Sequence, residues 1–304
     1  METWTLTAQT EDQGKRIDRF LSEKLTDLSR SYLQKLLKDA KVLREGQPVK
    51  ANYRLRYGDS FAVLLPEQKE PEILPENIPL DILFEDQDLL VVNKPKDMVV
   101  HPAAGHYKHT LVNALMYHCR DSLSGINGIL RPGIVHRIDK DTTGALVVCK
   151  NDRAHRALAE QLAVHSITRR YRAIACGYFP EEKFTVEGDI GRHPVDRKKM
   201  AVHVKNGKPA VTHVTVLQRL KGFSYIECEL ETGRTHQIRV HLSSIGHPIL
   251  GDPLYGPKKS PVPHLQGQIL HAMVLGFVHP RTGEYMEFTA PLPEYFKKLL
   301  QVLA

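Results

Sequence analysis

The sequence predicts an α+β protein: a mixed, largely antiparallel β-sheet with helices, preceded by a smaller α+β unit. Strand-like apolar runs alternate with amphipathic helical stretches, but without the regular strand–helix–strand repeat of a parallel α/β protein. A segment over residues 66–81, rich in proline and acidic residues, interrupts this pattern and is typical of a linker. We therefore expect two domains, over residues 1–75 and 76–304.

The composition is that of an ordinary globular protein: 304 residues, 41% hydrophobic and 25% charged, with a net charge of +7. No apolar run approaches the roughly 20 residues that span a bilayer, and the N-terminus lacks the pattern of a secretory signal. The four cysteines form no CxxC pair. We expect a cytoplasmic protein with no membrane partner, and the positive charge is compatible with a polyanionic one.

The first domain is predicted to hold two helices followed by short strands. Residues 15–25 place one phenylalanine and three aliphatic side chains on a single helical face. Ser29 or Ser31 can cap a second helix, and apolar runs separated by turns then continue to Phe61–Leu65.

Eight basic and only two acidic residues lie between Arg30 and Arg56. A charge run is usually a solvated face, but here the apolar residues are already needed for the core of a small unit, which favours phosphate contact. The unit resembles an S4 RNA-binding domain, through "RIDRFL" and "SRSYLQKLLKDAKVLREGQPVKANYRLRYGD". The basic residues that we expect to bind RNA in it are Arg30, Lys35, Lys38, Arg44 and Arg54.

The second domain is predicted to combine helices at residues 110–118 and 154–164 with many strands. The predicted strands are Leu89–Val92, Met98–Val100, Ala145–Val148, Tyr171–Ile174, Thr212–Leu217, Tyr225–Leu230 and Met286–Thr289.

The stretch "HRIDKDTTG", residues 136–144, holds two carboxylates beside fixed positive charge. If residues 134–139 are extended, Arg137 and Asp139 share one face at the end of a strand. Asp141 lies in a turn composition, where its carboxylate can accept backbone N–H groups. From this stretch alone, Asp139 is either a catalytic carboxylate or the partner of Arg137 in a surface ion pair.

A second stretch, "ETGRTHQIRVHLSSIG", predicts a helix that Thr235 can cap and that Gly246 closes. Arg239 falls in its first turns, where a cation opposes the helix dipole. Pairing with a carboxylate or a phosphate would explain this position, and a solvated arginine is the alternative.

A third stretch, "TRRYRAIACG", places Arg169 and Tyr171 on the same face of a predicted strand. An aromatic ring among arginines can stack on a base while the cations contact phosphates. A tyrosine at the edge of a sheet is the other interpretation.

Together these stretches resemble the RluA-type family of RNA pseudouridine synthases, most closely its large-subunit rRNA synthase D subgroup with an S4 domain in front. The resemblance runs from residue 15 to the end of the chain. It includes "LLVVNKPKDMVVHPAAGH", "LSGINGILRPGIVHRIDKDTTG", "KNDRAHRALAEQ", "RRYRAIACG", "IGRHPVDRKKMAV", "ETGRTHQIRVHLSSIGHPILGDPLYG" and "LHAMVLGFVHP".

The resemblance implies isomerisation of uridine to pseudouridine in RNA, and we expect the substrate to be 23S ribosomal RNA. Asp139 corresponds to the family's nucleophile, Tyr171 to the tyrosine that stacks on the uracil, and Arg239 to the basic partner of the aspartate. Arg137 corresponds to an arginine that contacts RNA near the extruded nucleotide. The reaction needs no cofactor and no metal, and we expect a monomer whose partner is rRNA.

Two other functions remain compatible with the sequence: an RNA-binding or ribosome-assembly protein without catalysis, and a synthase of the same mechanism that modifies tRNA or another rRNA site. Metal chemistry is disfavoured because the 16 histidines include no HExxH and no cysteine pair accompanies them.

Overall fold

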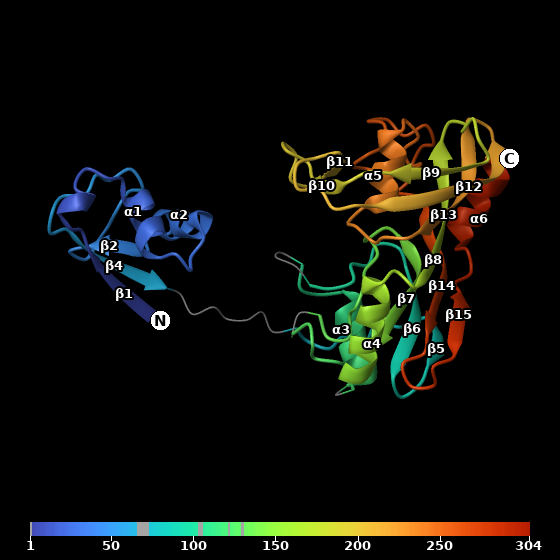
Figure 1. Cartoon of the computed structure of the whole chain (residues 1–304), viewed down its shortest axis with the longest axis horizontal. Helices are drawn as coiled ribbons and strands as arrows, with labels where there is room; N and C mark the ends of the chain where they lie inside the picture. Colours follow the sequence, from blue (N-terminus) through green and yellow to red (C-terminus); the bar gives the residue numbers. More distant parts are fainter. Residues whose placement is uncertain (1, 66–72, 103–105, 121, 129–130) are drawn as a thin grey trace. The chain divides into compact units, whose positions relative to one another are not determined.

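The computed structural model describes residues 2–65, 73–102, 106–120, 122–128 and 131–304. The chain divides into two compact units, Met1–Glu72 and Ile73–Ala304 (Figure 1). Residues 66–72 of the predicted linker lie outside the described residues. From Ile73 onward the chain belongs to the second unit, where Ile73 is buried and the N–H of Glu76 donates to the carbonyl of Asn113.

The first unit packs two helices against a four-stranded sheet of order β1-β4-β2-β3. The Ser29 hydroxyl caps the second helix by accepting the N–H of Tyr32, as one of the two predicted serines. The apolar face of the first helix is buried around Phe20 and Phe61. The elements are β1 (Glu2–Thr7), a 3₁₀ turn (Thr10–Asp12), α1 (Ile17–Lys24), α2 (Arg30–Lys38), β2 (Val42–Arg44), β3 (Gln47–Pro48) and β4 (Ser60–Leu65).

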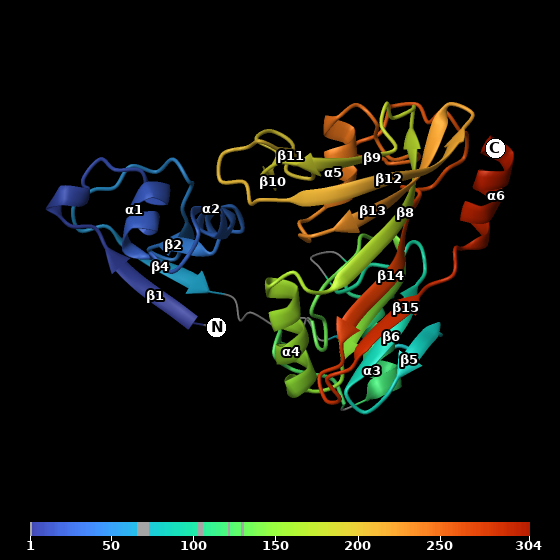
Figure 2. The ribbon, with the colours of Figure 1, turned by 45° about the vertical axis from the view of Figure 1, so that its right-hand side comes forward.

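The second unit is built on a nine-stranded sheet, and the prediction of a mixed, largely antiparallel sheet is confirmed. The order is β5-β6-β7-β14-β8-β13-β12-β9, with β15 also paired to β14. Among its described strands only β7 and β14 run parallel, and Figures 1 and 2 show β8 and β14 side by side through the unit. Its strands are β5 (Ile82–Glu85), β6 (Leu89–Lys94), β7 (Thr143–Cys149), β8 (Thr168–Cys176), β9 (Lys183–Glu187), β12 (Val211–Leu220), β13 (Phe223–Leu230), β14 (Leu270–Val278) and β15 (Tyr285–Thr289).

A separate hairpin of β10 (Ile190–Arg192) and β11 (Met200–Val202) extends from this unit. Four helices complete it: α3 (Leu111–Cys119), α4 (Asp152–Ala163), α5 (Gln237–Ser244) and α6 (Glu294–Leu303). No helix among the described residues has the length and apolar character needed to cross a membrane.

The strands β6 and β7 are buried on both faces, because α3 covers one face and α4 the other. Their side chains alternate between two apolar clusters, as a strand period of two requires. Those packed with α3 are Leu90, Val92, Leu146 and Val148, and those packed with α4 are Leu89, Val91, Ala145 and Val147. The α5 helix packs in the same cluster as α3, through Ile238 and Leu242.

The strand predicted at residues 98–100 is wrong, and residues 134–139, considered above as extended, do not form a strand. Residues 98–100 follow a turn at Asp97, whose φ is 64°, and the carbonyl of Met98 accepts a bond from the Lys94 side chain instead of a neighbouring strand. Residues 134–139 form only one isolated bridge, at Ile134, because the imidazole of His136 accepts the N–H of Val147. In both places a side chain hydrogen-bonds to a backbone group that could otherwise have paired with a neighbouring strand.

The cap predicted for α5 is also wrong. His236 is the N-cap residue, with a left-handed backbone (φ 56°, ψ 21°), and no side chain caps the helix from that position. The side-chain carbonyl of Gln237 instead accepts the N–H of Arg234 at 2.9 Å and folds the chain back at the start of the helix. Gly246, with φ +83°, closes the helix as predicted.

Candidate active site

Asp139 lies in a turn directly before β7. Its carbonyl accepts the N–H of Thr142 at 3.1 Å, which closes the turn. Thr142 and Thr143 are buried behind it; the Thr143 hydroxyl bonds to His271 at 2.7 Å, and the Gln268 amide donates to Thr142 at 3.1 Å. The turn is therefore anchored to β14 and the residues before it.

Gly144, the last residue of "DTTG", permits this anchoring. It pairs with Ala272 where β7 and β14 run parallel, and its φ is +113°. A Cβ atom at this position would lie 2.2 Å from the carbonyl oxygen of Ala272, so no other residue fits without moving a strand.

Asp141 does not form the predicted Asx-turn, since no hydrogen bond to its carboxylate occurs among the described residues. Its side chain instead packs against Gly267, where an added Cβ would lie 2.4 Å from the Asp141 carboxyl carbon. The Asp141 carboxylate therefore does not hold the turn that contains it.

Arg239 connects two carboxylates. Its Nε and Nη2 donate to the two oxygens of Asp252, at 2.7 and 2.9 Å, and its Nη1 donates to Oδ2 of Asp139 at 2.7 Å. Burial alone would lower the pKa of Arg239, but the bonds to Asp252 and Asp139 outweigh it and raise that pKa. Asp252 is fully buried and also accepts the N–H groups of Leu254 and Tyr255, so the guanidinium plane is held rigidly.

Tyr171 and Arg169 point to the same side of β8 and are both buried, as strand alternation predicts. The Arg169 guanidinium donates to the carbonyl of Glu231 at 2.9 Å, which holds it beside the ring. Burial raises the pKa of Tyr171, so its hydroxyl stays protonated at neutral pH.

These residues surround a cavity of about 340 Å³, near the lower end of the roughly 300–1,000 Å³ usual for small-molecule sites. Apolar walls and several arginines combine there with a single carboxylate. Residues that line it include Val135, Arg137, Asp139, Leu162, Arg169, Tyr171, Leu230, Arg234, His236, Arg239 and Leu270. The predicted residues Asp139, Tyr171, Arg239 and Arg137 are thus brought together.

Arg137 is exposed at this cavity, and its Nη1 lies 3.5 Å from Nε2 of His101. Burial, followed by the charge of Arg137, lowers the pKa of His101 to about 4. His101 is therefore neutral at pH 7 and leaves the charge of Arg137 available to an anion.

Lys94, at the end of β6, is a residue that the sequence interpretation missed. It is 1% exposed, and its ammonium donates to the carbonyls of Pro95, Met98 and Lys140, at 2.8, 2.8 and 3.0 Å. Burial lowers its pKa to about 7, although the charges of Asp141 and Asp139 oppose that shift. Through Lys140, Lys94 ties the turn that carries Asp139 to the chain after β6. The position of this lysine at the end of the apolar run "LLVVNK" is the sequence feature that could have indicated a buried charge.

His236 is a second residue that was missed as part of the site. Its Nδ1 lies 2.8 Å from the Tyr255 hydroxyl, and its Nε2 lies 3.8 Å from Oδ1 of Asp139. Burial lowers the pKa of His236, so the ring is neutral at pH 7. Its left-handed backbone at the start of α5 was not foreseeable from composition.

The basic residues predicted to bind RNA in the first unit differ in their contacts. Arg44 pairs with the buried Asp59 at 3.1 Å and bonds to Tyr53, so its charge is used internally. Arg30 lies 3.6 Å from Asp18, and Arg54 donates to the carbonyl of Gly14. Lys35 and Lys38 are exposed on one face of α2 and have no ion pair within the described part of the chain.

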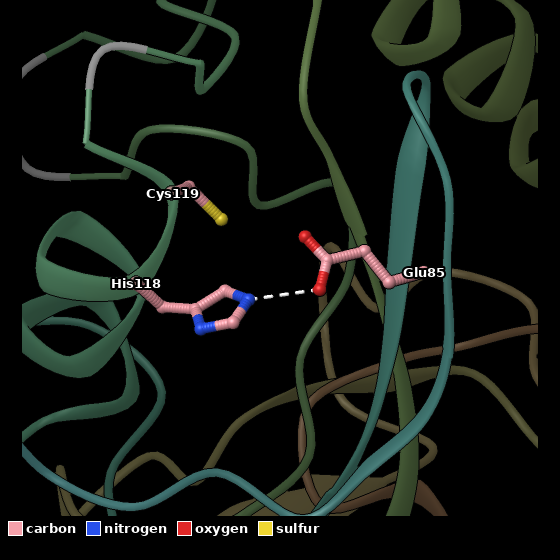
Figure 3. A group of neighbouring side chains, drawn as sticks. All are labelled: Glu85, His118 and Cys119. Carbon is pink, nitrogen blue, oxygen red and sulfur yellow. Dashed lines mark hydrogen bonds and ion pairs between the residues drawn. The ribbon is translucent and has the colours of Figure 1, made fainter.

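Two groups of potential metal ligands occur among the described residues. One joins Glu85, His118 and Cys119 (Figure 3), but Lys150 already donates to Glu85 at 2.9 Å and His118 bonds its other oxygen at 2.8 Å. Burial raises the pKa of Cys119 to about 11, which disfavours the thiolate that a metal needs. Both carboxylate oxygens are therefore occupied, and the thiol is in its unreactive form.

The other group is Asp86, Asp88 and His279. Arg281 donates to both oxygens of Asp88 there, and His279 bonds to Asp86 at 2.9 Å. An arginine thus occupies the position that a cation would take.

His136 gives the second unit a predictable sensitivity to acid. Its Nε2 accepts the N–H of Val147, and burial lowers its pKa from 6.5 to about 3. Between these values the unfolded chain binds the proton more tightly, so stability is lost as the pH falls, by up to about 1.4 kcal/mol per pH unit. Urea unfolding at pH 7, 6 and 5 should show a weaker decline for His136→Gln, which keeps an acceptor but does not titrate. Equal declines in both proteins would contradict this assignment.

Comparison with known proteins bears on the whole chain. Residues 88–244 match the family model of RNA pseudouridylate synthase, and residues 15–60 match the S4 domain. An uncharacterized RNA pseudouridine synthase of Bacillus subtilis (strain 168) is 53% identical over 298 residues, 98% of this chain and 97% of that protein. The ribosomal large subunit pseudouridine synthase D of Zymomonas mobilis is 50% identical over 312 residues, 100% of this chain and 98% of that protein.

A solved structure, human RNA pseudouridylate synthase domain containing 1, matches with a TM-score of 0.58 and 27% identity, over 75% of this chain and 95% of that one. The fold, the family model and the relatives agree along the length of the chain. The chain therefore belongs to the RNA pseudouridylate synthase family and is an enzyme that isomerises uridine to pseudouridine in RNA.

Proposed function

We propose that the substrate is large-subunit (23S) ribosomal RNA and that Asp139 is the nucleophile of the isomerisation. Relatives from Zymomonas mobilis, Neisseria meningitidis and Pasteurella multocida, 42–50% identical over nearly the whole chain, are named ribosomal large subunit pseudouridine synthase D. Their names support the choice of this RNA over tRNA.

The observation that carries the proposal is the unequal environment of the two Asp139 oxygens. Arg239 holds Oδ2 at 2.7 Å, whereas Oδ1 has no hydrogen bond within the described residues. The carboxylate is 19% exposed and lines the same cavity as Tyr171. A charged, oriented and partly accessible oxygen beside a buried aromatic ring suits attack on a nucleotide that enters the cavity.

The reaction requires this kind of cavity. The bond from ribose C1′ to uracil N1 must break, the base must turn, and C5 must join to C1′. C5 then loses its proton and N1 gains one, all on a base removed from its stack. Extrusion of a base costs a few kcal/mol, which stacking and phosphate contacts can offset. We assign stacking to Tyr171, orientation of the nucleophile to Arg239, and contact with the flanking phosphates to the exposed Arg137.

The first unit is proposed to add affinity for rRNA through Lys35 and Lys38. Replacing both by glutamine removes two unpaired charges, so RNA affinity should fall and the slope of log K against log salt should decrease by about 1–2. Filter binding of 23S fragments at several salt concentrations measures this. A matched control replaces Lys297 and Lys298 of α6 by glutamine, and an equal change of slope in the control would contradict the assignment.

We further propose that the enzyme acts as a monomer, since residues of one chain suffice to line the cavity, and that it is cytoplasmic, since its proposed substrate is ribosomal RNA. The decisive experiment maps pseudouridines in rRNA and tRNA from a strain that lacks this protein, before and after adding it back. Loss and recovery of sites in 23S rRNA is the expected result. Loss of sites confined to tRNA would show that tRNA is the substrate instead. If no site is lost in any RNA, the proposed function is contradicted.

A further inference from the structure

The cavity holds a hydrogen-bond donor that the roles assigned above do not use: the imidazole of His236. Two groups stand in a row behind it. The backbone N–H of Met200, in β11, donates to the Tyr255 hydroxyl at 2.8 Å, and that hydroxyl lies 2.8 Å from Nδ1 of His236. The Arg239 guanidinium lies 5.2 Å from the centre of the Tyr255 ring and helps to hold it.

This row determines which nitrogen of His236 carries the proton. The Tyr255 oxygen accepts from Met200, and within the described residues its own O–H has no acceptor other than Nδ1 of His236. Nδ1 is then the acceptor, and a neutral ring must carry its proton on Nε2. With this assignment, an Nε2–H group lies 3.8 Å from the unbonded Oδ1 of Asp139, on the wall of the cavity.

We propose that His236 is a catalytic residue that donates this Nε2–H bond to the carbonyl of the uracil next to the reacting atom. This inference rests on the proposed role of Asp139. When Oδ1 approaches C1′, the base atom bonded to C1′ is N1, and the carbonyl beside N1 is O2. The other ring neighbour of N1, C6, bears a hydrogen and cannot accept a bond, so a donor next to Oδ1 favours the orientation in which O2 faces it.

The donor supports the charge that the reaction creates. As the C1′–N1 bond breaks, its electron pair stays on the uracil, which becomes an anion shared between N1 and the two carbonyl oxygens. A positioned N–H group stabilises such a charge more as it develops than in the ground state. No proton leaves His236 in this step, so the ring stays neutral throughout.

The same donor serves the second half of the reaction because uracil is nearly symmetric about the line from N3 to C6. Rotation about that line exchanges N1 with C5 and O2 with O4. When C5 faces C1′, the carbonyl beside it is O4, in the place that O2 occupied. One donor beside Oδ1 therefore holds the base both before and after it turns.

The test uses the full-length protein and a 23S fragment whose mapped target is uridine, 2-thiouridine or 4-thiouridine, since sulfur is a weak acceptor. Single-turnover conversion is followed by mass spectrometry of the digested RNA. The variants are His236→Asn, which tolerates a left-handed backbone but is too short to reach the base, and His236→Gln, which is longer and keeps an N–H donor. His213→Ala is the matched control, an exposed histidine bonded to Thr185 and Glu231.

We expect His236→Asn to convert uridine about 10²–10³-fold more slowly than the wild type, with RNA affinity within about threefold and the thermal midpoint retained. His236→Gln should recover part of the rate. Each thio substitution should slow the wild type and His213→Ala but have a much smaller effect on His236→Asn, since the bond that it weakens is already absent.

The proposal is overturned if His236→Asn converts uridine within threefold of the wild type, or if both thio substitutions slow it as much as they slow the wild type. If His236→Asn does not fold, His236→Gln is used in its place. The proposal is then overturned if thio substitution slows His236→Gln as much as it slows the wild type. A wild-type protein that converts no RNA contradicts the proposed function instead, so the two failures are distinguishable.

Discussion

Asp139→Asn is expected to abolish conversion, with the release of tritium from 5-tritiated uridine in RNA falling about 10⁴-fold or more. Asparagine has nearly the same volume and can still accept the bond that Arg239 donates, at 2.7 Å in the wild type. It carries no charge, however, so it cannot attack the ribose or take a proton from it. RNA affinity should stay within about threefold, as measured by filter binding.

Asp141→Asn is the matched control for this prediction, two residues away in the same turn. Because no hydrogen bond to the Asp141 carboxylate occurs among the described residues, its amide analogue should keep most of the activity. Equal losses in the two variants would mean that the charge of the turn, rather than Asp139, supports the reaction.

Arg239→Lys is expected to lower the rate of conversion about 10²-fold and the free energy of unfolding by about 1–3 kcal/mol. A lysine keeps the positive charge but has a single nitrogen in place of the planar guanidinium fork. It therefore cannot donate two bonds to Asp252 and a third to Asp139 from separate nitrogens. The fully buried Asp252 would lose a partner, which accounts for the loss of stability. Single-turnover tritium release and urea unfolding measure the two effects.

Arg281→Lys applies the same chemical change to a second arginine–carboxylate pair, with Asp88. Arg281 does not line the cavity, so this control should lose stability but not activity. If Arg239→Lys converts RNA at the wild-type rate, the fork of Arg239 is not needed to orient Asp139.

Regular elements with a strong apolar pattern could be predicted from the sequence, because local physics determines them. The helix of residues 15–25 and the Ser29 cap are examples, with the observed helix at Ile17–Lys24 and the hydroxyl of Ser29 bonded to Tyr32. Arg169 and Tyr171 share a face of β8 for the same reason, since a strand alternates whatever its neighbours are.

The wrong predictions for residues 98–100, for residues 134–139 and for the start of α5 lie where a side chain bonds to a backbone group. The Lys94 ammonium donates to the carbonyl of Met98, and the His136 imidazole accepts the N–H of Val147. At the start of α5, the Gln237 side chain accepts the N–H of Arg234. Strand period and capping rules take no account of such side-chain bonds, so they fail there.

The residues of the active site could be predicted from the sequence only in part. The alternation of side chains along a strand left Asp139 as either a catalytic carboxylate or the partner of Arg137 in an ion pair. The resemblance to a family selected the catalytic role. Asp252 and Tyr255 were missed because each matters through contacts with α5, made across a loop that carries no periodic pattern. A fully buried aspartate is visible only once the fold is known.

The short parallel pairing of β7 with β14 has a consequence for when the enzyme becomes competent during synthesis. Gly144 meets Ala272 across 128 positions of sequence, and Asp139 meets Arg239 across 100. Contacts so distant along the chain are slow to form and cannot form before both partners have left the ribosome. A nascent chain that already displays its S4 unit therefore has no assembled nucleophile. Recognition of RNA can precede catalysis by most of the length of the polypeptide, so the unfinished protein cannot modify RNA at the site of its own translation.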